Sequence, residues 1–114
     1  MSEGIKTLIY PVTDLTRAKT AFTRLLGVEP YADQPNYVGF KVNDQDIGLD
    51  PNGHRSGMTG PVAYLHVADI QSSMQVLLDA GGEAQGKVRN VGAGRQIVTV
   101  KDTDGNAIGL LQDS

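Results

Sequence analysis

Residues 10–15 read Tyr-Pro-Val-Thr-Asp-Leu, and residues 65–70 read Leu-His-Val-Ala-Asp-Ile. In both stretches an apolar run ends at Val-x-Asp and is followed by a large aliphatic residue. The second stretch repeats the first 55 positions later, and two downstream residues repeat at the same distance, Phe22 as Leu77 and Gly27 as Gly82. Because the matches keep one order along the chain, they indicate an internal duplication.

The first copy predicts a strand, a helix and then further strands. Residues 5–12 are apolar and rich in β-branched side chains, which is typical of a strand. Asp14 stands at the expected helix N-cap, and Gly27 supplies a left-handed stop. Strand-like runs follow at residues 37–42 and 47–49. The apolar stripe expected on the helix comprises Leu15, Ala18, Phe22, Leu25 and Leu26.

The second copy predicts the same order of elements. Residues 62–67 form the expected strand, Asp69 is the helix cap, and Gly81-Gly82 ends the helix. Two strands are expected afterwards, at residues 96–101 and 107–111. Asp104-Gly105 between them predicts a hairpin turn, since both residue types tolerate a positive φ.

These patterns predict an α+β fold built from two tandem βαβββ modules. We expect one single domain, with module one at about residues 1–52, a linker at about 53–60 and module two at about 61–114. One module alone leaves a sheet face uncovered, so two modules are expected to form a curved mixed sheet with the helices outside. The concave face of such a sheet is a common place for a ligand.

Composition excludes several classes of protein. The 114 residues include no cysteine, which rules out disulfides, thiolate nucleophiles and thiolate metal sites. The formal net charge of −3 comes from scattered acids, which argues against nucleic-acid binding. No apolar run approaches the roughly 20 residues of a membrane span. The start, Met1-Ser2-Glu3-Gly4, lacks the basic and apolar regions of a signal peptide, so we expect a cytoplasmic protein.

The two opening stretches, together with Lys101-Asp-Thr-Asp-Gly-Asn-Ala-Ile, resemble the vicinal oxygen chelate superfamily. This is the family of glyoxalase I, extradiol dioxygenases, fosfomycin-resistance proteins and bleomycin-binding proteins. The last segment is close to the family's Asp-Pro-Asp-Gly-Asn hairpin, with Thr103 in place of the proline. The resemblance covers nearly the whole chain and implies the fold, but it implies no single activity, since this fold hosts many.

The resemblance also implies where metal-using members place their ligands. One ligand, usually His, lies seven residues before the helix-capping Asp, and another, usually Glu, lies in the last strand of each module. Those positions hold Thr7 and Val62, and Gly48 and Gly109, in this chain. Val and Gly have no donor atom, and a lone Thr hydroxyl is a poor ligand. We therefore expect no metal and no cofactor.

Strand periodicity predicts which side chains share the concave face. A phenol and an imidazole on one strand, with a carboxylate nearby, can bind a polar or cationic small molecule, and an arginine can clamp a carboxylate. The structural alternatives are a hydrogen-bonded histidine, a core tyrosine, turn aspartates and a solvated arginine. No catalytic residue is assigned. The candidate ligand-binding residues are Tyr64, His66, Asp46, Asp50, Arg95 and Thr7.

Three functions fit these residues. The first is a metal-free protein that binds a small molecule. The second is an enzyme, of a lyase, isomerase or dioxygenase-like kind, in which Tyr64, His66 and the cleft acids supply general acid and base groups. The third is an interaction module without a small ligand. A homodimer is expected, because relatives of this size usually pair.

Overall fold

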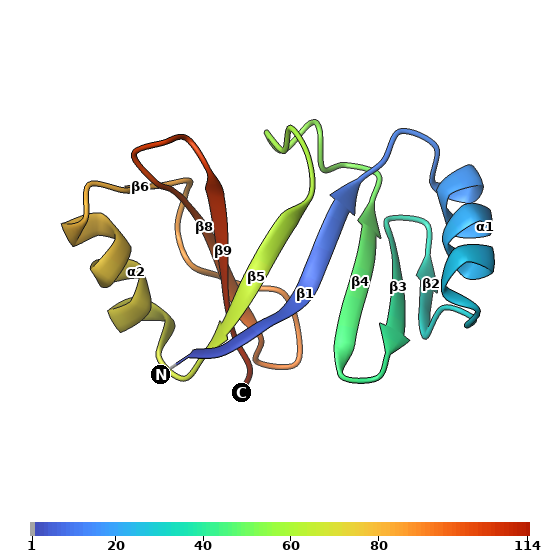
Figure 1. The fold of residues 1–114 in the computed structure, drawn as a ribbon, viewed down its shortest axis with the longest axis horizontal. Helices are drawn as coiled ribbons and strands as arrows, with labels where there is room; N and C mark the ends of the chain where they lie inside the picture. The colour runs from blue at the N-terminus through green and yellow to red at the C-terminus, as the bar shows by residue number, and fades with distance from the viewer. Residues whose placement is uncertain (1) are drawn as a thin grey trace. The chain divides into compact units, whose positions relative to one another are not determined.

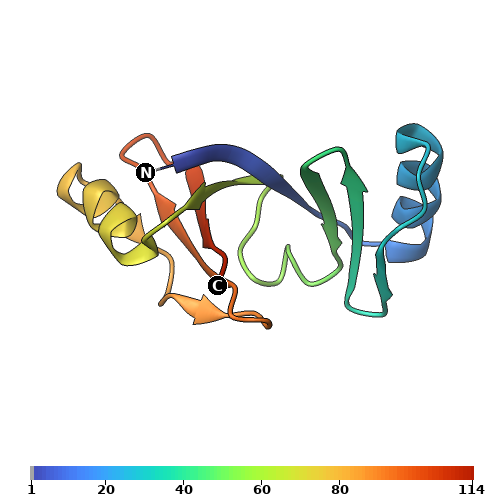
Figure 2. The same cartoon turned by 90° about the horizontal axis from the view of Figure 1, so that it is seen from below.

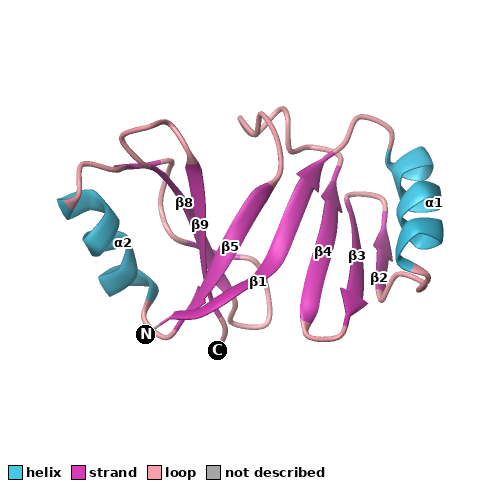
Figure 3. Ribbon diagram, viewed as in Figure 1, coloured by secondary structure: helices cyan, strands magenta, loops and turns pink. Residues whose placement is uncertain are grey.

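A computed structural model describes residues 2–114. These residues form two compact units. The N-terminal unit comprises residues 7–62. The C-terminal unit comprises residues 63–114 together with the first residues of strand β1 (Ser2–Pro11), up to Lys6. Each unit combines strands with one helix (Figure 1, Figure 3). No helix among residues 2–114 is long and apolar enough to cross a membrane.

The N-terminal unit has one parallel and two antiparallel strand pairs. After β1 come α1 (Leu15–Leu26), β2 (Ala32–Gln34), β3 (Tyr37–Val42) and β4 (Gln45–Asp50). Strand β1 pairs parallel with β4, β4 pairs antiparallel with β3, and β3 pairs antiparallel with β2. The crossover through α1 explains the parallel pair, because a parallel return needs a long connection.

The C-terminal unit repeats this connectivity. Its elements are β5 (Val62–Val67), α2 (Ile70–Asp79), β6 (Glu83–Ala84), β7 (Arg89–Asn90), β8 (Gln96–Lys101) and β9 (Ala107–Gln112). Strand β5 pairs parallel with β9, β9 antiparallel with β8, and β8 antiparallel with both β6 and β7. The predicted α+β class and the duplicated strand order are confirmed; the additional short strand β7 carried no sequence signal.

Both helices begin at the predicted caps. The Asp14 carboxylate accepts a hydrogen bond from the Arg17 backbone N–H at 3.0 Å, and Asp69 accepts one from the Ser72 N–H at 3.2 Å. Helix α1 ends at Gly27, whose φ of +74° is the left-handed conformation expected there. Helix α2 has a further acceptor, because the Gln112 side chain receives the Ile70 N–H at 2.8 Å.

Each helix packs on the strands of its own unit, as Figure 2 also shows. The core of the N-terminal unit centres on Val38, Phe40 and Leu49. The core of the C-terminal unit centres on Val67, Ile70, Val98 and Leu110.

The prediction that Leu25 belongs to the buried stripe of α1 is wrong, because its side chain is 77% exposed. Leu26 packs against the core instead. Neighbouring residues of an α-helix point about 100° apart, so only one leucine of the pair reaches the sheet. Phe22 lies four residues before Leu26 and shares its face.

The hairpin between β8 and β9 forms as expected around Asp104-Gly105, with a φ of +85° at Gly105. Asp102 organises it. Its Oδ1 accepts the backbone N–H groups of Asp104 and Asn106, and its Oδ2 accepts the Asn106 side-chain amide at 3.0 Å. These donors hold the pKa of Asp102 below its ordinary value, and the Asn106 side chain contributes most to this lowering.

Candidate functional site

The sheet face opposite the core of the N-terminal unit carries several polar side chains. On β3, Val38 and Phe40 belong to the core, so Tyr37, Gly39 and Lys41 point to the other face. Lys41 lies directly opposite Asp46 on β4.

On β1 and β4 the register places Thr7 beside Asp46, Ile9 beside Gly48, and Pro11 beside Asp50. The expected sharing of this face by Thr7 and the two aspartates therefore agrees with the strand pairing.

Two tyrosine rings cover the glycines on this face. A Cβ at Gly48 would collide with the Tyr37 hydroxyl, and would lie 2.8 Å from the Tyr37 Cε1 and 2.6 Å from the Ile9 Cδ1. A Cβ at Gly39 would lie 3.0 Å from Tyr37 Cε2 and 3.1 Å from Tyr31 Cε2. Ordinary contacts of a Cβ are longer than 3.4 Å. The glycines therefore provide the room in which the two rings lie.

Asp46 is a buried carboxylate, with 6% of the residue exposed. Its Oδ1 lies 3.4 Å from the Lys41 Nζ, so the two form an ion pair. The direction of approach is not that of a hydrogen bond, and Oδ1 accepts none from any described residue. Thr7, its neighbour on β1, is 3% exposed. A buried carboxylate oxygen without a donor is costly, so it marks a place where a donor is favoured.

Asp50 has a local structural role. Its Oδ1 accepts the backbone N–H of Asn52 at 2.8 Å, and its backbone carbonyl accepts the N–H groups of Val12 and Gly53. The carboxylate therefore stabilises the turn that follows β4, as aspartates commonly do.

In the C-terminal unit one tyrosine ring covers one glycine. Tyr64 and Gly109 are register partners on β5 and β9. A Cβ at Gly109 would collide with the Tyr64 Cδ1 and lie 2.7 Å from its Cγ and Cε1. The Tyr64 residue is 8% exposed. Tyr64 is thus held along the length of its ring against the backbone of β9.

His66 and Arg95 meet through a third residue that the sequence did not single out. The Arg95 Nε donates a hydrogen bond to the Asp113 Oδ1 at 2.7 Å, and the His66 Nδ1 lies 3.7 Å from the Asp113 Oδ2. The His66 side chain is 12% exposed, whereas that of Asp113 is 54% exposed. Asp113 follows the end of β9, where strand periodicity no longer predicts a direction.

Within each unit the structure brings two of the six candidates close together. Thr7 lies beside Asp46 in the N-terminal unit, and His66 lies with Arg95 around Asp113 in the C-terminal unit. Sequence reasoning also missed Tyr31, Tyr37 and Lys41. Tyr37 and Lys41 could have been found from strand alternation, because they lie three residues before and one residue after the core position Phe40 and therefore point to the opposite face. Tyr31 lies outside a strand and had no such signal.

The metal positions implied by the family do not fit a divalent cation. A glutamate at Gly48 or Gly109 would have to enter space that Tyr37 and Tyr64 already fill. Val62 has no donor atom and is buried. Among residues 2–114, no three His, Cys, Asp or Glu side chains gather in a way that could hold a metal ion.

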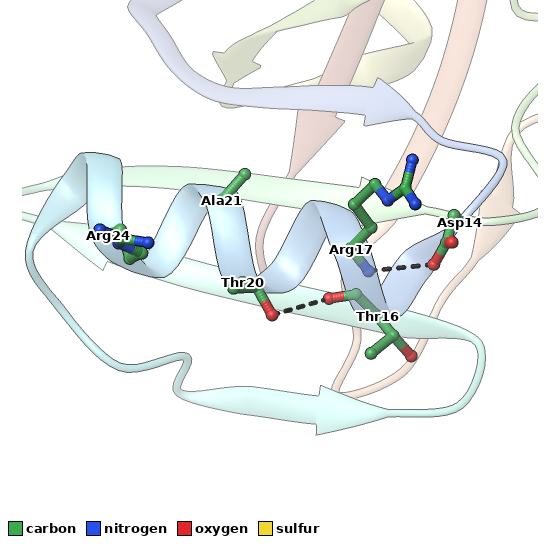
Figure 4. A pocket seen from close by; sticks show the side chains of 6 residues that line it. All are labelled: Asp14, Thr16, Arg17, Thr20, Ala21 and Arg24. Atoms are coloured by element: carbon green, nitrogen blue, oxygen red, sulfur yellow. Dashed lines mark hydrogen bonds between the residues drawn. The ribbon is translucent and has the colours of Figure 1, made fainter.

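A surface pocket lies elsewhere, along helix α1 (Figure 4). The hydrogen bonds within it are local, from the Thr20 hydroxyl to the Thr16 carbonyl and from the Arg17 N–H to the Asp14 carboxylate. None of the six candidate residues lines it. Its lining residues are Asp14, Thr16, Arg17, Thr20, Ala21 and Arg24.

Solved structures share this fold at low sequence identity. A methylmalonyl-CoA epimerase from Mycobacterium tuberculosis matches with a TM-score of 0.72 and 18% identity, over 99% of this chain and 89% of that one. A methylmalonyl-CoA epimerase from Streptomyces coelicolor, in complex with 2-nitronate-propionyl-CoA, matches with a TM-score of 0.75 and 14% identity, over 100% and 96%. A glyoxalase/bleomycin resistance protein/dioxygenase superfamily member from Vibrio splendidus matches with a TM-score of 0.70 and 18% identity, over 95% and 97%.

No curated protein matches the sequence. The model of one family does match, and it spans residues 4–110. That span includes both copies of the duplicated unit and the Asp-Thr-Asp-Gly-Asn hairpin. The chain belongs to the glyoxalase/bleomycin resistance protein/dioxygenase superfamily.

Proposed function

We propose that this protein binds a small organic molecule and uses no divalent metal at the family's ligand positions. One observation carries the proposal: in both units the position of the family's carboxylate ligand is a glycine covered by a tyrosine ring, Tyr37 over Gly48 and Tyr64 over Gly109. A phenol group, rather than a carboxylate, is therefore present at each position. Phenols donate and accept hydrogen bonds and offer apolar ring surface, which suits an organic ligand.

The proposed contacts are the six residues predicted from the sequence, to which Tyr37 is added. The Streptomyces epimerase structure holds an acyl-CoA compound in a similar fold. That likeness supports a small-molecule ligand without naming it. We also propose that the protein is a cytoplasmic homodimer. Thr7, Asp46, Asp50, Tyr64, His66 and Arg95 are the residues whose substitution should alter ligand affinity.

The first experiment is metal analysis and native mass spectrometry of one sample of purified, untagged protein. The expected result is a dimer with far less than one divalent metal per chain, and with any copurified ligand visible as added mass. One tightly held divalent metal per chain would overturn the metal-free proposal.

The second experiment is a thermal-shift screen of small organic molecules in the presence of EDTA. Compounds that raise the unfolding midpoint are then titrated against Tyr37→Phe and Tyr64→Phe. Tyr10→Phe is the matched control, because Tyr10 packs against the core of the N-terminal unit. We expect Tyr37→Phe and Tyr64→Phe to bind these compounds more weakly than the unaltered protein, and Tyr10→Phe to bind them equally well. Failure of every compound to raise the midpoint would contradict the binding proposal.

A proton-transfer enzyme is the second candidate, and it is favoured by the His66 and Asp113 pair. A carboxylate beside one ring nitrogen orients an imidazole so that the other can take a proton. The test compares the turnover of the unaltered protein with that of three variants, on any substrate found among the bound compounds. His66→Ala should abolish turnover and Asp113→Asn should reduce it, while His54→Ala serves as the control. Unchanged turnover in His66→Ala would remove this candidate.

A further inference from the structure

We propose that Tyr31 and Asp46 form a subsite for the alkylammonium group of a ligand, and that the side chain of Lys41 fills this subsite in the structure. The inference rests on the proposed small-molecule binding and names the chemical class that one part of the ligand would have. An ammonium group is suited to a place that combines an aromatic face with a carboxylate.

The geometry around the Lys41 ammonium supplies both features. Its Nζ lies 5.3 Å from the centroid of the Tyr31 ring, within the range of a cation–π contact, and 3.4 Å from the Asp46 Oδ1. Tyr31 is held beside β3, because its backbone N–H donates to the Gly39 carbonyl at 2.9 Å. The ring lies against Gly39, where no side chain stands in its way.

Lys41 and Asp46 differ in burial, so Lys41 is the partner that a ligand could displace. The Asp46 side chain is 8% exposed, whereas the Lys41 side chain is 59% exposed. The Tyr31 residue is 53% exposed. Lys41 is also a flexible side chain, and its ammonium approaches Asp46 without making a hydrogen bond. A ligand ammonium with N–H donors can supply the bond that the Asp46 Oδ1 lacks, once Lys41 moves into solvent.

The duplicated unit provides an internal comparison. Gly39 pairs with Gly48 on β3 and β4, and Lys41 pairs with Asp46 two residues further along. On β8 and β9, Thr99 pairs with Gly109, and Lys101 pairs with Ala107. Lys101 thus holds the corresponding strand position with Ala107 opposite it on β9, although its partner on β6 is Glu83. An aspartate at the position of Asp46 is therefore not a feature of the repeated strand pairing, which argues for a specific role of Asp46.

The experiment is chemical rescue of Lys41→Ala with n-butylammonium chloride, which has the four-carbon chain and the charge of a whole lysine side chain, one carbon more than the substitution removes. The thermal unfolding midpoint is followed with increasing n-butylammonium, with n-butanol and sodium chloride as controls for the chain and the charge. Lys101→Ala is the matched variant. We expect the midpoint of Lys41→Ala to rise with n-butylammonium alone. The apparent affinity of Lys41→Ala for n-butylammonium should exceed that of Lys101→Ala by about two- to fivefold, as for an exposed cation–π contact.

Asp46→Asn placed on Lys41→Ala should abolish the rescue. Equal responses of Lys41→Ala and Lys101→Ala, or rescue by n-butanol, would overturn the proposal and leave a structural ion pair only. In the unaltered protein, n-butylammonium should shift the nuclear magnetic resonance signals of Tyr31 and Lys41, and n-butanol should not; absence of that difference would also overturn it. A ligand found by mass spectrometry that lacks an amine would contradict this inference while leaving small-molecule binding intact.

Discussion

The two units share one strand order but differ in the side chains that occupy corresponding positions. In the N-terminal unit, Tyr37 reaches Gly48 from the antiparallel neighbour β3. In the C-terminal unit, Tyr64 reaches Gly109 from the parallel neighbour β5. The same packing arrangement, a ring over a glycine, is thus built from different strands. Backbone pairing is what the duplication kept, and the side chains on the face opposite the core were free to diverge.

The cores differ as well. The N-terminal core contains an aromatic cluster, with ring centroids 5.1 Å apart for Tyr10 and Phe22 and 6.4 Å apart for Phe22 and Phe40. The buried core of the C-terminal unit is aliphatic. Loss of one large ring should therefore cost more than loss of one aliphatic side chain.

The largest expected effect comes from truncating Phe40, which is fully buried. Phe40→Ala should lower the free energy of unfolding by about 3–5 kcal/mol, because it removes buried apolar surface and leaves a cavity. Leu110→Ala is the counterpart in the C-terminal unit and should cost less. Urea unfolding followed by circular dichroism measures both. A larger loss for Leu110→Ala would contradict the difference between the cores.

Adding a methyl group to each glycine tests the two tyrosine contacts. Gly109→Ala should destabilise by about 1–3 kcal/mol, because the new Cβ meets a buried ring along its length. Gly48→Ala should cost less, since its Cβ meets the tips of Tyr37 and Ile9, which can move aside. Denaturant titration gives both values. In the Tyr64→Leu background the cost of Gly109→Ala should fall; an unchanged cost would show that the ring is not the obstacle.

The two helix starts differ in how many side chains stabilise them. Asp14→Ala should cost about 1 kcal/mol, because α1 loses the carboxylate that accepts the Arg17 N–H. Asp69→Ala should cost less, since Gln112 still accepts the Ile70 N–H of α2. Chemical denaturation of the two variants measures this difference. Adding Gln112→Ala to Asp69→Ala should remove the remaining stabilisation of the start of α2. Equal losses of stability in Asp14→Ala and Asp69→Ala would refute the comparison.

The smallest expected effect is the loss of stability at low pH that comes from Asp102. The side chain and the backbone N–H of Asn106 hold the pKa of Asp102 below its ordinary value of 3.8. A lowered carboxyl pKa adds stability that is fully present above pH 3.8 and is lost as the pH falls through the lower pKa of the folded state. Stability measured at about pH 5 and about pH 3 should therefore fall more in the unaltered protein than in Asp102→Asn. Equal falls would contradict this assignment.

Local patterns predicted much of the fold because their causes are local. Asp14 and Asp69 cap helices whose free N–H groups lie within three residues. The predicted strands at residues 37–42, 62–67 and 96–101 have the observed bounds. The short strands β2, β6 and β7 were not predicted. They contain only two or three residues, and their pairing with β3 or β8, rather than any periodicity, defines them.

The candidate site was less predictable than the fold. Sequence reasoning named Asp46 and Thr7, but not the Lys41 and Tyr31 side chains that accompany Asp46. It named His66 and Arg95, but not the Asp113 carboxylate between them. Each of these contacts joins residues from different elements or from beyond a strand end. Their meeting depends on strand register and loop path, which no local pattern contains.

The sequence by itself determined the duplication, the order of strands and helices, the helix caps and the family, because each is recorded in residue types at short spacing. The tertiary structure alone decided that tyrosine rings lie over the glycines at positions 48 and 109, and that Lys41 lies close to both an aromatic ring and a buried carboxylate. The physical reason is that cross-strand register sets which side chains share space, and a shift of one residue would send each of them to the opposite face.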